Sequence, residues 1–390
     1  MTEVLVAGVG ATDFGEHPDR TGRELFAEAR SLALERSTVS DTDLDALYYG
    51  NFLGATAEEQ NHQAPLMAAG LAGPDLEATR VENACASGGY AVADAVRAIR
   101  SGDVDVVLVG GMERMTNLGT AATTATLAHA ADAVHEVGAG VTFPGAYGLL
   151  ADAYLERHDA SHEDLAHVAV KNHANAATNP KAQYREEIDV ADVLEAPTVA
   201  DPLGLYDACP ITDGAAAAVL VSPEYAAAQD LEPAAAITGS GRGTDALALQ
   251  DRDDLTRTKA AEAAADDAYE QADIEPADVD LAEVHDCFTI AELLALEALG
   301  LYEPGEAASA ARNGETTADG DLPVNLSGGL KAKGHPVGAT GVSQLVELTK
   351  LLDGSHPNAD AVPAATTGVA HNAGGTVATA SVHVLEEVGA

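Results

Sequence analysis

The sequence predicts an α/β protein made of two similar halves. Three observations lead to this prediction: the chain has 390 residues, short apolar segments alternate with amphipathic ones, and the second part of the chain repeats the pattern of the first. A chain of this length exceeds what one hydrophobic core usually supports, so two or more packed units are expected.

The first half contains two predicted strands and a helix between them. Residues 4–9 and 104–109 are short apolar runs of the kind found in strands buried on both faces. Residues 88–100 form an amphipathic helix whose inward face carries residues at helical spacing, namely Val92, Val96 and Ile99. Helix and strand alternate, which defines the α/β class.

Residues 117–205 differ in character from what precedes them. A stretch rich in Thr, Ala and Gly is followed by an expected helix at 149–157 and by a capping-box pattern at Ser161–Asp164 that opens another helix. We expect an inserted region here, after which a small-residue strand at 215–221 returns the chain to the first sheet.

The second half repeats this order of elements. Strands are expected at 234–238 and 279–284, a polar-faced helix at 257–273, and a helix at 290–299 capped by Thr289 and stopped by Gly300. Internal duplication is also suggested by two small-residue segments that enter expected strands, Asp213–Val219 and His371–Val377. The expected units are residues 1–116 with 206–232, the inserted region 117–205, and residues 233–390.

The net charge of −43 excludes a nucleic-acid partner and an anionic membrane, because both would repel such a surface. The chain has six lysines and no Trp, and its acidic residues fall on expected exposed helix faces. This composition favours a halophile, since molar salt shortens the Debye length to roughly 3 Å. An acidic protein adapted to ordinary salt is the alternative.

The three cysteines are too few and too scattered for a disulfide framework or a zinc cluster, so we expect free thiols and no metal. The N-terminal sequence lacks a basic flank followed by a long apolar core, and no apolar run approaches the roughly 20 residues of a membrane span. A cytoplasmic location is therefore expected.

Cys85 lies among small residues at the expected start of a helix, in ENACASGG. Unpaired N–H groups and the positive end of the helix dipole stabilise a thiolate, so a lowered pKa of the Cys85 thiol is expected. The alternative is a buried, inert cysteine at a tight helix start.

Three further segments carry histidines. His335 stands among glycines in GGLKAKGHPVGATG, where it can act as a base near neutral pH. His285 and Cys287 follow an expected strand in VHDCF, the position at which open α/β sheets bring loops to ligands. His371 stands beside small residues in HNAGG, at an expected strand entrance. For His335 the alternative is a solvated loop histidine. For VHDCF the alternative is a core cysteine beside a capping His and Asp.

Together these four segments resemble the thiolase superfamily over essentially the whole chain. The sequence is most similar to thiolases of the sterol-carrier-protein type and their archaeal relatives, which carry HDCF and His-Asn where other thiolases have an Asn-Glu-Ala-Phe loop and a second catalytic Cys. The resemblance implies a five-layer α-β-α-β-α core formed by the two halves, with an inserted loop domain.

The resemblance also implies roles for these residues. Cys85 would be acylated by an acyl-CoA, with His335 as the base, and Cys287 would remove the α-proton of acetyl-CoA, with His371 as the competing candidate. One oxyanion hole would use His285 and His335, and the other the backbone N–H of Cys85 with one from Ala373–Gly374. Ser240, in Gly239-Ser240-Gly241, would contact coenzyme A.

The implied reaction is condensation of two acetyl-CoA to acetoacetyl-CoA, or thiolysis in reverse, with coenzyme A as substrate or product and no tightly bound cofactor. A dimer or tetramer and a small zinc-ribbon and OB-fold partner protein are implied as well. The competing hypotheses are another condensing enzyme or aldolase of the superfamily, and a non-catalytic scaffold that binds coenzyme A or lipid.

Overall fold

The computed structural model describes residues 2–72 and 76–388, and within them one mixed sheet of nine strands runs through the molecule. The strand order is β3-β2-β4-β7-β1-β8-β11-β10-β9. The strands are β1 (Val4–Ala11), β2 (Ala46–Gly50), β3 (Glu77–Val81), β4 (Val106–Glu113), β7 (Gly214–Val221), β8 (Ala235–Thr244), β9 (Leu281–Glu283), β10 (Thr367–Gly374) and β11 (Thr379–Glu386).

The two halves of the sheet repeat one arrangement. In the first half β1 pairs antiparallel with β7, β7 antiparallel with β4, and β4 parallel with β2. In the second half β8 pairs antiparallel with β11, β11 antiparallel with β10, and β10 parallel with β9. The halves meet where Val4 of β1 pairs with Ile237 of β8. The predicted duplication is confirmed.

The two small-residue segments Asp213–Val219 and His371–Val377 are not equivalent in the duplicated halves, so this part of the prediction is wrong. Asp213 directly precedes β7, whereas His371 lies inside β10, which is the counterpart of β4 rather than of β7. His371 is therefore not at a strand entrance but near the carboxyl end of a strand. Both segments are rich in small residues because both lie in the crowded middle of the molecule, and composition alone cannot distinguish their places in the sheet.

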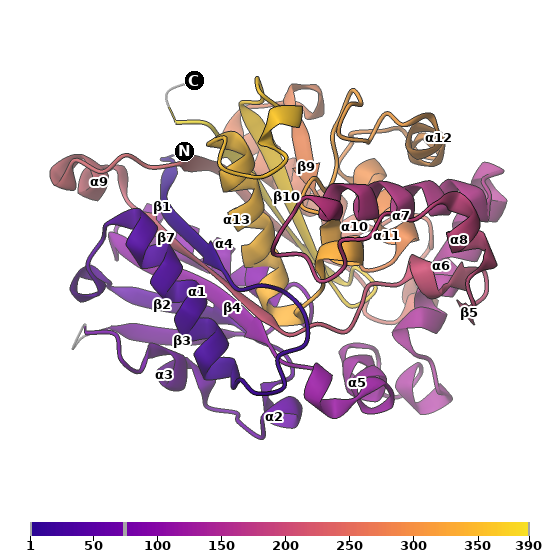
Figure 1. Cartoon of the computed structure of the whole chain (residues 1–390), viewed down its shortest axis with the longest axis horizontal. Coiled ribbons are helices and arrows are strands. Elements are labelled where there is room, and N and C mark those ends of the chain that lie inside the picture. Colours follow the sequence, from indigo (N-terminus) through magenta and orange to yellow (C-terminus); the bar gives the residue numbers. More distant parts are fainter. Residues whose placement is uncertain (1, 73–75, 389–390) are drawn as a thin grey trace.

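Helices complete five layers, as Figure 1 shows. In the middle, α4 (Ser87–Ser101) and α13 (Thr340–Leu352) contact each other and contact strands of both halves. On the outside, α1 (Gly22–Ser37) packs on β1 and β7, and α10 (Lys259–Ala272) packs on β8 and β11. The predicted α-β-α-β-α order is thus observed.

The inner helix α4 has the amphipathic pattern that the sequence predicts, with Val92 and Val96 fully buried. The outer helix α10 packs so closely on β8 that three positions of this strand leave no room for a side chain. A Cβ atom at Gly241 would lie 1.9 Å from the carbonyl oxygen of Ala264, and similar conflicts exist at Gly239 and Gly243. The glycines of Gly239-Ser240-Gly241 are therefore explained by helix packing.

Residues 117–205 connect β4 to β7 and carry most of their structure as helices. The predicted capping pattern opens α7, where the backbone N–H and the hydroxyl of Ser161 both donate to the carboxylate of Asp164. The elements are α5 (Thr120–Leu127), α6 (Phe143–His158), α7 (His162–Ala177), α8 (Val190–Glu195), β5 (Thr198–Ala200) and β6 (Leu203–Gly204). The remaining helices are α2 (Gly54–Ala57), α3 (Gln63–Ala68), α9 (Pro223–Gln229), α11 (Thr289–Ala298) and α12 (Glu306–Asn313). Across the described residues, none of the helices is both long and apolar enough to cross a bilayer.

Candidate active site

Three of the predicted site residues meet at one point. The Sγ of Cys85 and a ring nitrogen from each of His285 and His335 lie within 4.8 Å of one another. Cys85 comes from the turn before α4, His285 follows β9, and His335 lies in the loop before α13. The two imidazole rings are perpendicular, with centroids 5.0 Å apart. Segments separated by up to 250 positions thus surround one thiol.

The turn that presents Cys85 is tight and locally strained. Ala84 has a φ of +50°, a value that residues with a side chain rarely adopt. The hydroxyl of Ser87 donates to the carbonyl oxygen of Ala84 at 2.6 Å and accepts from the N–H of Asn83 at 2.9 Å. These two bonds hold the chain in the reversal that carries Cys85.

Burial, with smaller contributions from Glu113 and Glu82, raises the pKa of the Cys85 thiol to about 12. The N–H groups of Gly375 and of Cys85 itself lower the pKa of this thiol, but they do not outweigh burial. The expectation of a lowered pKa at a helix start is therefore wrong, because Cys85 precedes the first helical residue and lies among apolar groups. At neutral pH the thiol keeps its proton until a base removes it.

His335 is held in the form of such a base. Its Nδ1 lies 2.7 Å from the hydroxyl of Thr340, which itself donates to the carbonyl oxygen of Pro336 at 3.1 Å. The hydroxyl has one hydrogen, so it accepts from Nδ1–H of His335 and leaves a lone pair on Nε2. Burial lowers the pKa of His335 to about 3, so the ring is neutral at pH 7.

His285 is held in the opposite form. The side-chain oxygen of Asn372 accepts from the N–H of Gly89 at 3.1 Å, so its NH₂ group faces Nδ1 of His285 at 3.1 Å and also donates to the carbonyl oxygen of Cys85. Nδ1 of His285 accepts, and its Nε2 carries the hydrogen. That Nε2 has no partner within the described residues. Burial also lowers the pKa of His285 well below its ordinary value.

His371 lies next to this group. Its Nδ1 accepts from the backbone N–H of His285 at 3.5 Å, so its hydrogen also sits on Nε2, for which the described residues provide no partner. Burial lowers the pKa of His371 to about 4. The neutral ring therefore presents a donor rather than a basic lone pair at Nε2.

Cys287 is buried beside the same group, and burial raises its pKa well above the ordinary value. The hydroxyl of Tyr147 donates to the carbonyl oxygen of Gly375 at 2.9 Å and lies close enough to Cys287 to lower the pKa of this thiol, which opposes that effect. Tyr147 comes from α6 and stacks on Phe288 with ring centroids 4.6 Å apart. Tyr147 could not be predicted as part of the site, since nothing in its local sequence marks it.

The backbone donor expected from Ala373 or Gly374 differs from the one observed. Both residues lie inside β10 and pair with β11. The N–H that reaches Cys85 belongs to Gly375, whose φ of +64° turns the chain just after the strand. The prediction was wrong by one residue, because the end of the strand could not be located from a run of small residues.

Two buried carboxylates hold the loop that carries His335. Asp286 accepts from the N–H groups of Leu330 and Lys331 at 2.6 and 3.2 Å, and Glu113 accepts from the N–H of Gly338 at 3.1 Å. A Cβ atom at Gly329 would lie 2.2 Å from Asp286, which explains that glycine. The sequence analysis quoted Asp286 within its motif without assigning it a role, and it passed over Glu113.

Ser240 is not brought to this group. It lies inside β8, is 6% exposed, and its hydroxyl is 3.1 Å from Nδ1 of His383, whose other nitrogen bonds to Gly89. The structure does not support Ser240 as a contact of coenzyme A, because β8 is enclosed between α4 and α10.

Thiolate and imidazole are also the ligand types of zinc, and Cys85, His285 and His335 are near enough to be considered. Ligands of one tetrahedral zinc ion lie about 3.5 Å apart, given bonds of about 2.0 to 2.3 Å. Among the described residues the group contains these three ligand atoms, and the hydrogen of His285 sits on Nε2, so the arrangement suits acid–base chemistry better than a zinc site.

Comparisons with known proteins match the whole chain. The thiolase N-terminal domain family matches residues 4–224, and the thiolase C-terminal domain-like family matches residues 241–387. An acetyl-CoA acetyltransferase of Methanothermobacter thermautotrophicus is 42% identical over 385 residues, covering 99% of this chain and all of that protein. Human sterol carrier protein 2 is 31% identical over 388 residues, covering 96% and 70%. Among solved structures, an Ltp2-ChsH2(DUF35) aldolase superposes with a TM-score of 0.84 at 26% identity, covering 99% and 98%.

Proposed function

Because the chain belongs to the thiolase family, we propose that it condenses two acetyl-CoA to acetoacetyl-CoA and coenzyme A, or cleaves a 3-ketoacyl-CoA in the reverse direction. It is an acyltransferase that uses coenzyme A thioesters. The observation that carries the proposal is the group formed by Cys85, His285 and His335, in which a thiol faces one basic and one donating imidazole.

In the first step Nε2 of His335 takes the proton of Cys85 as the sulfur attacks the thioester carbonyl. The tetrahedral oxyanion accepts a hydrogen bond from Nε2–H of His285. The bond to the sulfur of coenzyme A then breaks, and His335 returns the proton to that sulfur. The neutral state of His335 supports this role, since burial lowers its pKa to about 3.

In the second step the proton of the Cys287 thiol passes to the neutral ring of His335, and the Cys287 thiolate removes a proton from the α-carbon of acetyl-CoA. The resulting carbanion attacks the acyl group on Cys85. The oxyanion formed there accepts from the N–H groups of Cys85 and Gly375. When the bond to Cys85 breaks, Cys287 passes the proton from the α-carbon to that sulfur, and His335 returns its proton to Cys287. Burial makes this thiolate a strong base, as removal of a carbon-bound proton requires. The tautomer of His371 supports a donor role for that residue.

The experiment is an assay of coenzyme A release in high salt, first with acetyl-CoA and then with acetoacetyl-CoA plus coenzyme A, followed by mass spectrometry of the quenched protein. We expect turnover and an acetyl adduct on Cys85. Absence of both, with the protein folded and any partner supplied, would remove the proposal.

The rival activity within the superfamily is aldol cleavage, because one of the similar solved structures is an aldolase complex. An aldolase has no use for an acylated cysteine or a second thiol base, so the Cys85 and Cys287 pair favours the thiolase reaction. A non-catalytic scaffold has no need of opposite tautomers on His285 and His335.

We further propose a small partner protein of the DUF35 type, because the similar aldolase structure is a complex with such a protein. We propose that this partner contains a zinc ribbon and an OB-fold. We also propose that the chain forms a homo-oligomer and that residues 117–205 are an inserted domain between the two halves. The net charge of −43 supports a working environment of concentrated salt. We also propose a cytoplasmic location, based on the short apolar runs of the sequence.

A further inference from the structure

One lysine differs from the other five in its surroundings. Each of the others has a carboxylate oxygen within 4 Å: Lys171 at 2.9 Å from Glu292, Lys181 at 2.8 Å from Asp13, Lys259 at 3.1 Å from Asp253, Lys333 at 3.5 Å from Glu347, and Lys350 at 3.7 Å from Glu347. Lys331 is 2% exposed and has no such partner among the residues described. In a protein with 63 acidic residues this cannot reflect a shortage of carboxylates.

The ammonium group of Lys331 has donors to spare. One hydrogen bond reaches Nε2 of His173 at 3.3 Å. His173 is fixed in that accepting form, because its Nδ1–H donates to the carbonyl oxygen of Glu186 at 2.9 Å. The ring of Tyr206 lies 5.7 Å from the ammonium nitrogen. An ammonium group has three donors, so two remain for a ligand.

The ammonium group lines a pocket of about 300 Å³. Tyr184 and Tyr206 form aromatic walls around His173, Leu205 lies exposed at the rim, and the exposed Glu186 also borders the pocket. At roughly 30 Å³ per water-sized group, the pocket has room for about ten non-hydrogen atoms. A largely apolar wall with one buried cation fits a short carbon chain that ends in an anion.

The pocket adjoins the reacting thiols. Cys209 lines it, and the backbone N–H of Cys209 donates to the carbonyl oxygen of Cys287 at 3.0 Å, beside the bridge between Ala208 and Phe288. Cys85 is close enough to Cys209 to raise the pKa of that thiol. Cys209 therefore belongs to the pocket wall and also contacts the loop that carries Cys287.

We propose that this pocket binds a carboxylate through Lys331, and that the carboxylate is supplied by the far end of the acyl group of a substrate or by a free small acid. The first source rests on the proposed function and would make acyl-CoA thioesters with a terminal carboxylate the preferred substrates. An ion pair in a buried site is screened little by salt, so it remains effective in a concentrated medium.

The test compares thiolysis of 3-ketoadipyl-CoA with that of 3-ketohexanoyl-CoA, which has the same number of acyl carbons but ends in a methyl group. We expect kcat/KM at least tenfold higher for the carboxylate substrate in the native protein, and a ratio near one in Lys331→Met. Lys259→Met, at an exposed ion pair on α10, is the matched control and keeps the native ratio.

If Lys331→Met does not fold, Leu205→Glu serves instead, because it adds a negative charge at an exposed rim position and should lower the ratio at least threefold. The free-acid source is tested by thermal unfolding with added propionate at constant ionic strength. The pocket is assigned to free acids if propionate stabilises the native protein but not Lys331→Met, and the native protein does not discriminate between the two substrates.

The inference is overturned if the native protein has equal kcat/KM for the two substrates and propionate does not change its thermal unfolding. Turnover of acetoacetyl-CoA separates this result from a failure of the proposed function. Inactivity toward acetoacetyl-CoA contradicts the proposed function, whereas activity toward it without discrimination contradicts only the role of Lys331.

Discussion

Hydrogen bonds to the far nitrogens of two histidines assign them different tasks at the same thiol. Thr340 accepts from His335 and leaves a basic Nε2, whereas Asn372 donates to His285 and leaves a hydrogen on Nε2. Each supporting side chain is itself fixed by a backbone group, Pro336 for Thr340 and Gly89 for Asn372. Neither histidine can exchange its role without breaking one of these bonds.

Replacement Asn372→Asp tests this arrangement. A carboxylate only accepts, so it would draw the hydrogen of His285 to Nδ1 and turn a lone pair toward the oxyanion. We expect kcat to fall about 100-fold, the usual loss for one oxyanion donor, with KM for acetyl-CoA changed less than threefold. Asn313→Asp at the end of α12 is the control for the same chemical change. An unchanged kcat would show that the tautomer of His285 is irrelevant.

The pH dependence of Cys85 acetylation tests the state of His335. Protonation removes the basic lone pair, so the rate is lost as pH falls through the pKa of His335, which burial lowers to about 3. Between pH 8 and 5.5 the rate should change less than twofold. A histidine with the ordinary pKa of about 6.5 would lose about tenfold over that range. Rapid quenching with mass spectrometry measures the rate, and circular dichroism checks the fold at each pH.

Replacement Cys287→Ala separates the two steps of the reaction. The acetyl adduct on Cys85 should still form at a rate within threefold of the native value, because the first step uses only His335 and His285. Condensation should fall at least 1000-fold, since the base that takes the α-proton is gone. His371→Ala is the parallel variant. Normal condensation in Cys287→Ala, with loss in His371→Ala, would transfer the base role to His371.

The candidate catalytic side chains could be predicted from the sequence, but the groups that set their protonation states could not. Cys85, His285, Cys287, His335 and His371 stand out because each lies among small residues or just beyond an expected strand. Asn372 was visible in its motif, but its effect on His285 depends on Gly89, 283 positions away. Tyr147 and Glu113 act through similar long-range contacts, and no local pattern marks them.

Among the elements, strand and helix positions were predictable where apolar periodicity was strong, as in α4, β4 and β7. Strand β8 was expected to end at residue 238 and in fact continues to Thr244. The glycines that made its second part resemble a loop are required by the closeness of α10. A glycine that admits a neighbouring backbone and a glycine in a turn are alike in sequence.

Replacement Gly241→Ala tests that explanation. Its Cβ would lie 1.9 Å from the carbonyl oxygen of Ala264, so β8 and α10 must separate. We expect a loss of about 3 kcal/mol in stability, the upper end for an overpacked core, seen as a lower thermal midpoint. Gly145→Ala in α6 is the control, since its nearest atom is 3.6 Å away. Equal midpoints for the two variants would contradict the packing argument.

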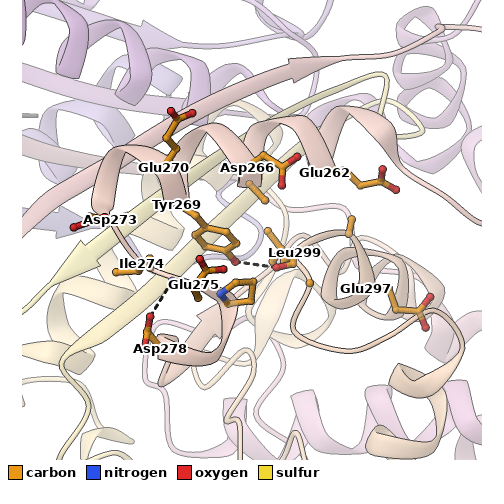
Figure 2. A pocket seen from close by; sticks show the side chains of 14 residues that line it. Glu262, Asp266, Tyr269, Glu270, Asp273, Ile274, Glu275, Asp278, Glu297 and Leu299 are labelled. Carbon is orange, nitrogen blue, oxygen red and sulfur yellow. Dashed lines mark hydrogen bonds between the residues drawn. The ribbon is translucent and has the colours of Figure 1, made fainter.

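Across the whole molecule, negative charge exceeds positive charge, with 63 acidic residues against 20 Lys and Arg. A hollow of about 650 Å³ lies beside α10. Figure 2 shows carboxylates that project from the helix and from the loop that follows it. Its acidic residues are Glu262, Asp266, Glu270, Asp273, Glu275, Asp278 and Glu297. None of the candidate catalytic residues lines this hollow.

The stability of the molecule should therefore depend on salt. At low ionic strength the carboxylates repel one another, whereas in about 1 M salt the Debye length falls to roughly 3 Å and the repulsion is screened. We expect the thermal midpoint to rise by at least 10 °C between 0.1 and 2 M KCl. Sucrose at matched osmolarity is the control, and a midpoint independent of KCl would contradict the assignment to concentrated salt.

The pairing of β1 with β8 also constrains how the chain can be assembled on a ribosome. The edge of β1 that faces β8 stays open until Ala235 has been made, 14 positions after the end of β7. At 5 to 20 residues per second this delay is about one to three seconds, during which a nascent chain exposes an unpaired strand. The thiol of Cys85 gains its last backbone donor only when Gly375 has been made, 290 positions later along the chain.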